Sequence, residues 1–192
     1  MEQEIAQALG AFLPPEALPL AAQMFRPAEA RRDTYLLAAG QRCRYVYLLV
    51  KGSARMSYIA DGREHIGDFF VEGDFVTDYS SFLTQTPSHL NLICCEDCSL
   101  LVLEYDTLQQ AYADYPQWTE PMGRRLAEQN CIVFARRIWS SLTDSPTRRY
   151  QLLLAEKPHW FRRFPQYMIA SYLGLTPEGL SKLRRRLAQG AP

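Results

Sequence analysis

The 192-residue chain lacks the features that mark a membrane or secreted protein. No stretch reaches the roughly 20 consecutive apolar residues that a membrane-spanning helix needs. Glu2 and Glu4 precede only a short apolar run, where a signal peptide would begin with basic residues. We therefore expect a cytoplasmic protein with no membrane partner.

Cysteine and histidine are also scarce, with five and three copies. An odd, low number of cysteines does not suit a secreted disulfide scaffold and fits a reducing compartment. Cys94, Cys95 and Cys98 form the only cluster, but neighbouring strand residues point to opposite faces and do not readily share one metal ion. We expect these cysteines to be buried core residues, while a redox role stays open.

Catalytic patterns are absent as well. The sequence contains no nucleophile paired with a base, no metal-ligand spacing and no glycine-rich phosphate loop. We expect no enzyme, no catalytic residue, no metal site and no bound cofactor.

Charge is present but unevenly distributed, although the net charge is zero. Residues 1–144 carry 12 basic and 19 acidic side chains, whereas residues 145–192 carry 9 basic and 2 acidic ones. The C-terminal part, with a net charge of +7, is therefore suited to a polyanion such as nucleic acid.

β-favouring runs separated by glycines occupy the chain from about Ala28 to Tyr105. The clearest runs are residues 45–50, 54–59, 90–95 and 100–103. Asp61-Gly62 supplies the positive φ angles of a tight hairpin turn. Short strands at intervals of about ten residues predict a β-roll of the double-stranded β-helix, or jelly-roll-like, kind.

Helical patterns flank this β-rich region, which makes the expected fold class α+β. Residues 1–25 suggest two short amphipathic helices, and one long helix is expected from Pro116 to about Leu142. Its apolar positions Met122, Leu126, Val133 and Ile138 either meet a second copy of the chain, which we favour, or pack wholly on the roll. Ser145-Pro146 is a helix start and the best boundary. The expected domains are a sensor over 1–115, a dimerisation helix and linker over 116–144, and an all-α domain over 145–192.

The most specific segment is residues 165–187, which has the pattern helix, turn, helix. Ile169, Ala170 and Leu173 supply one buried face, Gly174 ends the first helix and Thr176 caps the second. Leu180, Leu183 and Leu187 face the core. The residues that remain available to contact DNA are Thr176, Glu178, Gly179, Ser181, Lys182, Arg184, Arg185 and Arg186. We expect Arg184, Arg186 and the pairs Arg148-Arg149 and Arg162-Arg163 mainly to neutralise phosphates.

Residues 169–184 resemble the helix-turn-helix of Crp/Fnr transcription regulators, and the glycine-punctuated segments 47–52, 73–75 and 97–103 are similar to that family's cyclic-nucleotide-binding β-roll. The resemblance covers essentially the whole chain. It implies a homodimer joined through the helix after Pro116, a palindromic double-stranded DNA operator, and RNA polymerase as a further partner.

The resemblance fails at the effector site. The family's Gly-Glu and Arg-Ser pairs fall on Thr77-Asp78 and Ser88-His89, so the arginine that binds the cyclic phosphate is missing. Asp78, Ser88 and His89 are the candidate effector residues, for an effector other than a classical cyclic nucleotide, unless the regulator is constitutively active. The pocket either holds another small molecule or is filled by core aromatics, namely Phe69, Phe70, Phe75, Tyr79 and Phe82. Gly179, in the first turn of the second helix, and the short C-terminus also leave room for an alternative, a sensor or protein-interaction module with a degenerate helix-turn-helix.

Overall fold

A computed structural model describes residues 2–10 and 13–189. The chain divides into two compact units, Met1–Gln129 and Asn130–Pro192. The α+β class is confirmed, with a β-roll of eight strands and a long helix after it. None of the described helices is both long and apolar enough to cross a membrane.

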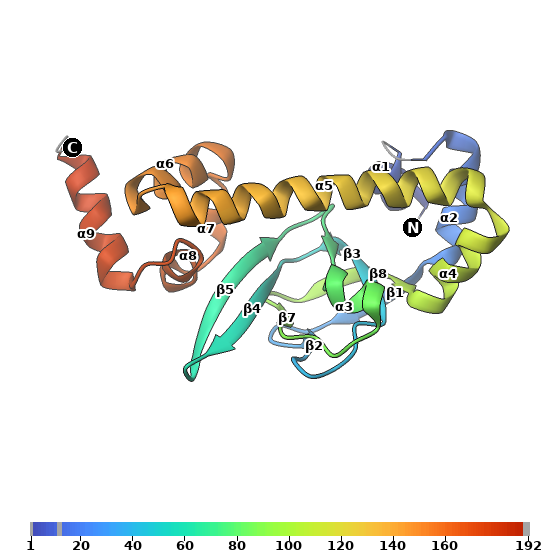
Figure 1. Cartoon of the computed structure of the whole chain (residues 1–192), viewed down its shortest axis with the longest axis horizontal. Coiled ribbons are helices and arrows are strands. Elements are labelled where there is room, and N and C mark those ends of the chain that lie inside the picture. The colour runs from blue at the N-terminus through green and yellow to red at the C-terminus, as the bar shows by residue number, and fades with distance from the viewer. Residues whose placement is uncertain (1, 11–12, 190–192) are drawn as a thin grey trace. The chain divides into compact units, whose positions relative to one another are not determined.

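The first unit is built on two antiparallel four-stranded sheets (Figure 1). The first sheet has the order β1-β8-β3-β6, and the second has the order β2-β7-β4-β5. The strands are β1 (Arg26–Ala30), β2 (Tyr35–Leu37), β3 (Tyr45–Lys51), β4 (Ala54–Ala60), β5 (Arg63–Phe70), β6 (Phe75–Val76), β7 (Asn91–Cys94) and β8 (Cys98–Glu104). The four expected runs thus all form strands.

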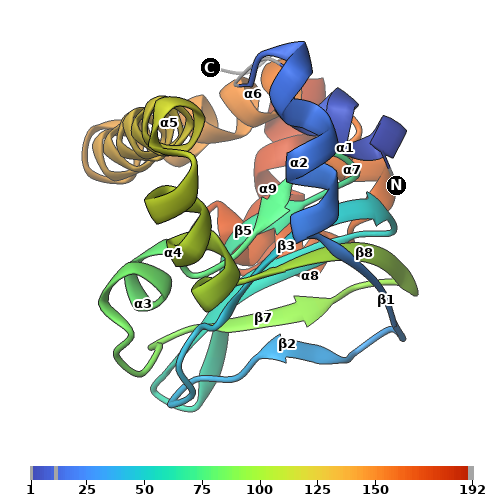
Figure 2. The ribbon, with the colours of Figure 1, turned by 90° about the vertical axis from the view of Figure 1, so that its right-hand side faces the viewer.

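Strand β8 shows why the first sheet is buried on both faces. Leu100 and Val102 point into the core between the two sheets, together with Leu92 of β7. The alternate residues Leu101 and Leu103 pack on the opposite face, against the N-terminal helices. Figure 2 shows α1 (Glu2–Leu9) and α2 (Leu18–Met24) on that outer side of β3 and β8. Burial on two faces explains the continuous apolar run, which a strand with one wet face would not need.

The expected Asp61-Gly62 hairpin joins β4 to β5. Asp61 has a φ of 51° and Gly62 a φ of 70°, and Ala60 pairs with Arg63 directly across the turn. A two-residue loop with two positive φ angles matches the right-handed twist of the strands that it connects. The hairpin prediction is confirmed.

Three short helices were not predicted: α3 (Tyr79–Thr84), α4 (Tyr105–Asp114) and α7 (Trp160–Arg163). A single 3-10 turn, η1 (Pro15–Ala17), also precedes α2. The two expected N-terminal helices are present, and Ile5 and Leu9 of α1 are buried against Leu101 and Leu103 of the first sheet.

The expected long helix is α5 (Pro116–Thr143), and the boundary between the units lies within it. The second unit continues with α6 (Pro146–Glu156), α8 (Gln166–Tyr172) and α9 (Pro177–Ala188), besides α7. Ser145 caps α6 by accepting a hydrogen bond from the Arg148 amide, and Pro146 is the first helical residue. This is the start that the Ser-Pro pair predicted.

Candidate functional site

Helices α8 and α9 are joined by a short turn over residues 173–176. Ile169 and Leu173 are almost fully buried, as are Leu180 and Leu183 of α9. Gly174 has a φ of 70°, a left-handed conformation that suits glycine at a helix end. The apolar spacing and the glycine therefore give the compact helix pair that the sequence predicted.

Thr176 begins α9 as its N-cap. Its hydroxyl accepts a hydrogen bond from the Gly179 amide at 3.1 Å, and Pro177 occupies the first helical position. Gly179 keeps a negative φ, and a Cβ there would lie 3.3 Å from the Thr176 hydroxyl oxygen. A side chain at this position would therefore make a tight contact with the cap.

The outward face of α9 carries the polar residues expected to meet DNA. At 3.6 residues per turn, Glu178, Lys182 and Arg185 lie opposite the buried leucines, while Arg184 and Arg186 lie on the two flanks. The exposed members of the predicted set are Thr176, Glu178, Ser181, Lys182, Arg184, Arg185 and Arg186, whereas Gly179 is half-buried. Leu187 is also only half-buried, so it contributes less to the core than expected.

An open groove of about 870 Å³ runs between α6 and α9. Ser181, Arg184 and Arg185 line its α9 side, and Tyr150 and Leu154 line its α6 side. Part of the basic face of α9 therefore borders an uncharged surface of α6.

Arg149 stabilises the turn between α8 and α9. The sequence did not predict this role. Its guanidinium donates to the Leu173 carbonyl at 3.0 and 3.2 Å and to the Asp144 carbonyl at 2.8 Å. These carbonyls follow the ends of α8 and α5, where intrahelical donors run out. Arg149 therefore has a structural role that was not expected for the Arg148-Arg149 pair, and its expected phosphate contact stays a prediction, while Arg148 is exposed.

The apolar stripe of α5 is divided. Met122 is buried and Leu126 half-buried in the cluster that α1, α2 and the first sheet form. Val133 and Ile138 are each 56% exposed. The other large apolar side chains exposed in this half of the helix are Ile132, Phe134, Trp139 and Leu142. Because four further apolar side chains accompany Val133 and Ile138, this half of α5 presents a patch larger than a lone surface residue would.

The predicted effector residues are close in sequence but differ in environment. Asp78 is buried and caps α3 by accepting from the Ser81 amide at 3.2 Å. Ser88 is buried, and its hydroxyl donates to the Leu90 carbonyl and accepts from the Leu90 amide. His89 is exposed. Asp78 and Ser88 thus have local structural partners, and His89 lies at the surface.

The aromatic residues of this region do not share one environment. Phe69 and Phe82 are almost fully buried, and Phe82 packs edge-on against Tyr105. Phe70, Phe75 and Tyr79 are half-buried. Phe82 belongs to the main core, so at this position the packing interpretation is the one that the structure supports.

A wider stretch around this region is free of strong cations. Residues 64–123, which include α3, β7 and β8, contain no lysine or arginine. An anion bound beside Asp78 and Ser88 would find only uncharged donors and histidine within this stretch. The missing arginine is therefore not replaced from within residues 64–123, although Arg42, on another segment, forms a β-bridge with Pro87 beside Ser88.

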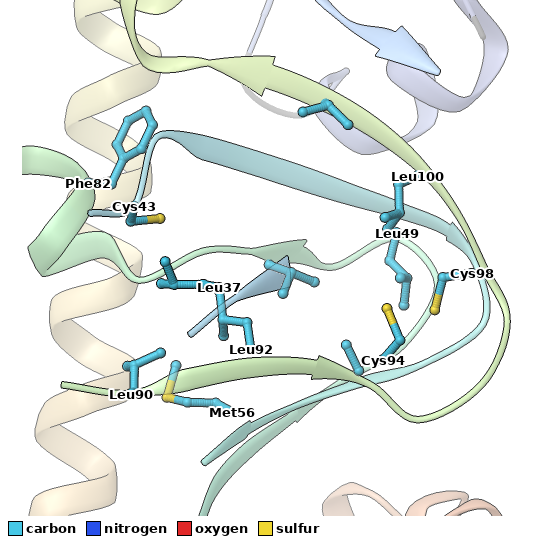
Figure 3. Packing of buried hydrophobic residues seen from close by; sticks show 13 residues of the cluster. Leu37, Cys43, Leu49, Met56, Phe82, Leu90, Leu92, Cys94, Cys98 and Leu100 are labelled. Carbon is cyan, nitrogen blue, oxygen red and sulfur yellow. The ribbon is translucent and has the colours of Figure 1, made fainter. Parts of the chain in front are cut away.

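The cysteine cluster lies at one end of the core, opposite Cys43 and Phe82 (Figure 3). Cys94 and Cys98 are fully buried core residues, as predicted, and their mutual hydrogen bond and burial raise the pKa of Cys94. Cys95 is half-buried, and burial raises its pKa despite the Arg55 guanidinium 3.9 Å away. No group of three metal-ligating side chains occurs within residues 2–10 and 13–189.

Comparisons with known proteins agree with this architecture. The family model of the cyclic nucleotide-binding domain matches residues 27–115. A search of curated proteins gives no match. Residues 27–115 include all eight strands except Arg26, the first residue of β1, and this is the part of the chain where the resemblance to the Crp/Fnr sensor was expected.

Solved structures of the same fold include FixK2 from Bradyrhizobium japonicum, with 21% identity, 86% of each chain covered and a TM-score of 0.71. The c-di-GMP-responsive global regulator CLP of Xanthomonas campestris is 17% identical over 91% of this chain and 92% of that chain, with a TM-score of 0.67. The Thermus thermophilus catabolite activator protein is 19% identical over 95% of this chain and 87% of that chain, with a TM-score of 0.59. Residues 27–115 are therefore similar in sequence to the cyclic nucleotide-binding domain, and the chain shares the fold of these three proteins.

Proposed function

We propose that the chain is a sequence-specific, DNA-binding transcription regulator of the Crp/Fnr kind. The observation that carries the proposal is the exposed polar face of α9. The apolar faces of α8 and α9 are buried and hold this face in place. Lysine and arginine can donate to guanine in the major groove, and glutamate can accept from the cytosine amino group. Lys182, Arg185 and Glu178 supply these groups on one face.

The charge of the second unit supports the same function. Residues 145–192 carry a net charge of +7 on a chain of zero net charge. Basic side chains around a readout helix neutralise phosphates and give binding that weakens with salt. Arg184 and Arg186 flank α9 and are exposed, which suits phosphate contacts on either side of the groove.

A homodimer is the expected working form. The exposed apolar residues of α5 after Gln129 would be covered by the same stripe of a second copy, as in a parallel coiled coil. Two copies related by a two-fold axis would read two half-sites about one helical turn apart. RNA polymerase is the further partner that we propose.

We propose that the effector, if the protein has one, is not a classical cyclic nucleotide. The cation-free segment 64–123 and the local hydrogen bonds of Ser88 support this view. A cyclic phosphate needs a fixed guanidinium or an equivalent set of donors. The response to c-di-GMP is a property of CLP, and we do not transfer it to this chain.

The test is genome-wide capture of DNA bound by the tagged protein in its own cell. The capture is repeated with the Lys182→Ala/Arg185→Ala double variant and with a control that removes the same charge from the first unit, Lys51→Ala/Arg63→Ala. Both control positions are exposed. We expect discrete palindromic peaks that the α9 variant loses and the control retains.

Binding of the recovered sites in vitro gives the salt dependence. Affinity for DNA falls as salt rises, and removing two contacts should make this dependence less steep. The slope of log affinity against log salt concentration should shrink in magnitude by up to about 2 if both contacts are to phosphate, and by less if they are to bases. Peaks that are absent, or that persist in the α9 variant, would refute direct readout. The interaction-module alternative would then be the better description.

A further inference from the structure

We propose that a cavity beside the start of β3 binds a small organic carboxylate with an apolar body. The cavity has a volume of about 390 Å³. It is lined by Leu36, Leu37, Gln41, Arg42, Cys43, Arg44, Tyr45 and Tyr47. The lining comes from β2, β3 and the loop between them and includes none of Asp78, Ser88 and His89. The proposed site therefore adjoins the predicted effector site without including its residues, because the Gln41 carbonyl accepts a hydrogen bond from the Ser88 amide at 2.8 Å.

The floor of the cavity is apolar and well fixed. Leu37 and Cys43 are almost fully buried. Tyr47 bridges the two sheets, because its hydroxyl donates to the Leu36 carbonyl at 3.2 Å. The hydroxyl hydrogen of Tyr47 is therefore already used in a hydrogen bond. The centroid of its ring lies 6.0 Å from that of Tyr45, and the ring offers an apolar surface.

Two of the cations at the cavity, Arg42 and Arg44, have no side-chain partner among the described residues. Neither Arg42 nor Arg44 makes an ion pair or a side-chain hydrogen bond within the described parts of the chain. The acidic residue closest in the strand ladder, Glu104, pairs through its backbone with Tyr45 and forms no ion pair with either arginine. Arg26 adds a third positive charge, 5.6 Å from the centre of the Tyr45 ring.

These arginines lie in a basic stretch of an acidic part of the chain, because residues 26–63 carry eight basic and three acidic side chains. Residues 1–144 carry seven more acidic than basic side chains, and residues 64–123 carry no lysine or arginine. Arg55, another cation of the roll, is paired with Glu64 at 3.0 Å. Arg42 and Arg44 are therefore unneutralised cations at a concave surface of an acidic domain.

The loop that carries the arginines is held by hydrogen bonds to Ser81 and Gln85, at α3, and by one within the loop itself. The Cys43 amide donates to the Ser81 hydroxyl at 3.0 Å, and Gln85 of the α3 C-terminus donates to the Cys43 carbonyl at 3.1 Å. Gln41 accepts from the Ala38 amide at 3.3 Å through its side-chain oxygen. A ligand would therefore bind to a loop whose backbone is already ordered. This lowers the entropic cost of ordering the loop on binding.

The lining specifies the class of ligand. Two arginines line the cavity, and a guanidinium group can bind a carboxylate with paired hydrogen bonds. Leucine, cysteine and tyrosine surfaces favour an aromatic or aliphatic body. A volume of about 390 Å³ lies within the range of small-molecule sites, about 300–1,000 Å³. The predicted ligand is therefore an amphipathic monoanion of modest size.

The test uses calorimetric titration of the full chain with 1-naphthoate and octanoate. The neutral probe 1-naphthamide is the control, since it has the same ring system without the charge. We expect the acids to bind and the amide to bind at least about ten-fold more weakly, because charge-assisted contacts dominate. Backbone amide NMR shifts should concentrate in residues 36–47.

The Arg42→Ala/Arg44→Ala variant should bind both acids at least about ten-fold more weakly. Both positions are exposed, so this variant should fold normally. The charge-matched control, Arg31→Ala/Arg63→Ala, removes two exposed arginines outside the cavity and should bind as the unchanged chain does.

Three results would overturn the proposal. They are no binding of either acid at millimolar concentration, equal binding of acid and amide, and undiminished binding by the Arg42→Ala/Arg44→Ala variant. No DNA is present in these titrations, so their outcome is independent of the proposed regulatory function.

Discussion

The guanidinium of Arg137 lies over the aromatic ring of Tyr172, with 3.7 Å between the guanidinium carbon and the ring centroid. The same guanidinium donates a hydrogen bond to the Tyr172 carbonyl. Arg137 belongs to α5 and Tyr172 is the last residue of α8. The pair therefore links α5 directly to the helix that supports α9.

Replacing Arg137 with alanine should loosen α8. The loss of a cation–π contact and a hydrogen bond to a carbonyl should cost about 1–3 kcal/mol of local stability. Hydrogen exchange measured by mass spectrometry should then become faster in peptides that cover residues 166–172. Arg136→Ala is the matched control, because Arg136 is exposed and adjacent. Equal exchange in the two variants would contradict the assigned role.

Arg149→Ala should destabilise the second unit more than Arg148→Ala. Arg149 satisfies the carbonyls of Leu173 and Asp144, whereas Arg148 is exposed. We expect a loss of about 1–3 kcal/mol for Arg149→Ala and less than about 0.5 kcal/mol for Arg148→Ala. Urea unfolding followed by circular dichroism measures both. A larger loss for Arg148→Ala would show that the assignment is reversed.

Mild oxidation should cross-link two copies of the chain through Cys131. Cys131 is exposed and lies one heptad before Ile138, so both fall on one stripe of α5. In a parallel dimer the two Cys131 residues would face each other within reach of a disulfide. A non-reducing gel after treatment with diamide should show a dimer band.

Cys131→Ser should abolish that band, while Cys95→Ser should leave it unchanged. Cys95 is half-buried within the roll and serves as the control thiol. A dimer band that survives Cys131→Ser, or that depends on Cys95, would argue against pairing along α5.

Stability should fall at high pH in a way that depends on Tyr47. Burial raises the pKa of Tyr47 to about 12, whereas the unfolded chain has a value of about 10. The contribution is fully present below about pH 10 and is lost as the pH rises toward about 12, because the unfolded state ionises first. Tyr47→Phe removes this dependence and one hydrogen bond to Leu36, worth about 1 kcal/mol.

Urea unfolding of both proteins at several pH values between 9 and about 11.5 gives the test. The unchanged chain should be more stable at pH 9, and the difference should shrink as the pH rises. The other tyrosines are common to both proteins and cancel. A difference that stays constant with pH would mean that Tyr47 ionises normally.

Local chemistry explains what the sequence predicted well. Asp61-Gly62, Ser145 and Thr176 each act through groups within three residues of themselves, so their roles could be derived from neighbouring residues alone. The buried leucines of α9 follow from helical periodicity. The run 100–103 of β8 was recognised because burial on both faces makes a strand continuously apolar.

The missed features depend on contacts between distant residues. Arg149 reaches Leu173 across 24 positions, and nothing near Arg149 separates it from Arg148 as a candidate phosphate ligand. The cavity at Arg42 and Arg44 similarly arises only when β2 and β3 join different sheets. Helices α3 and α7 are short, and their amphipathic pattern is too brief to identify. Within α5, the sequence could not show that Met122 is covered while Ile138 is exposed.

The position of β8 also bears on how the chain is made. In the first sheet this strand lies between β1 and β3, with Arg26 opposite Val102 and Leu48 opposite Leu101, although it is the last of the eight strands to be synthesised. A nascent chain that ends before Cys98 therefore leaves two strand edges unpaired, and such edges promote aggregation. We therefore expect the first sheet to be completed only after β8 has emerged from the ribosome, and until then its unpaired edges are open to a chaperone or to another chain.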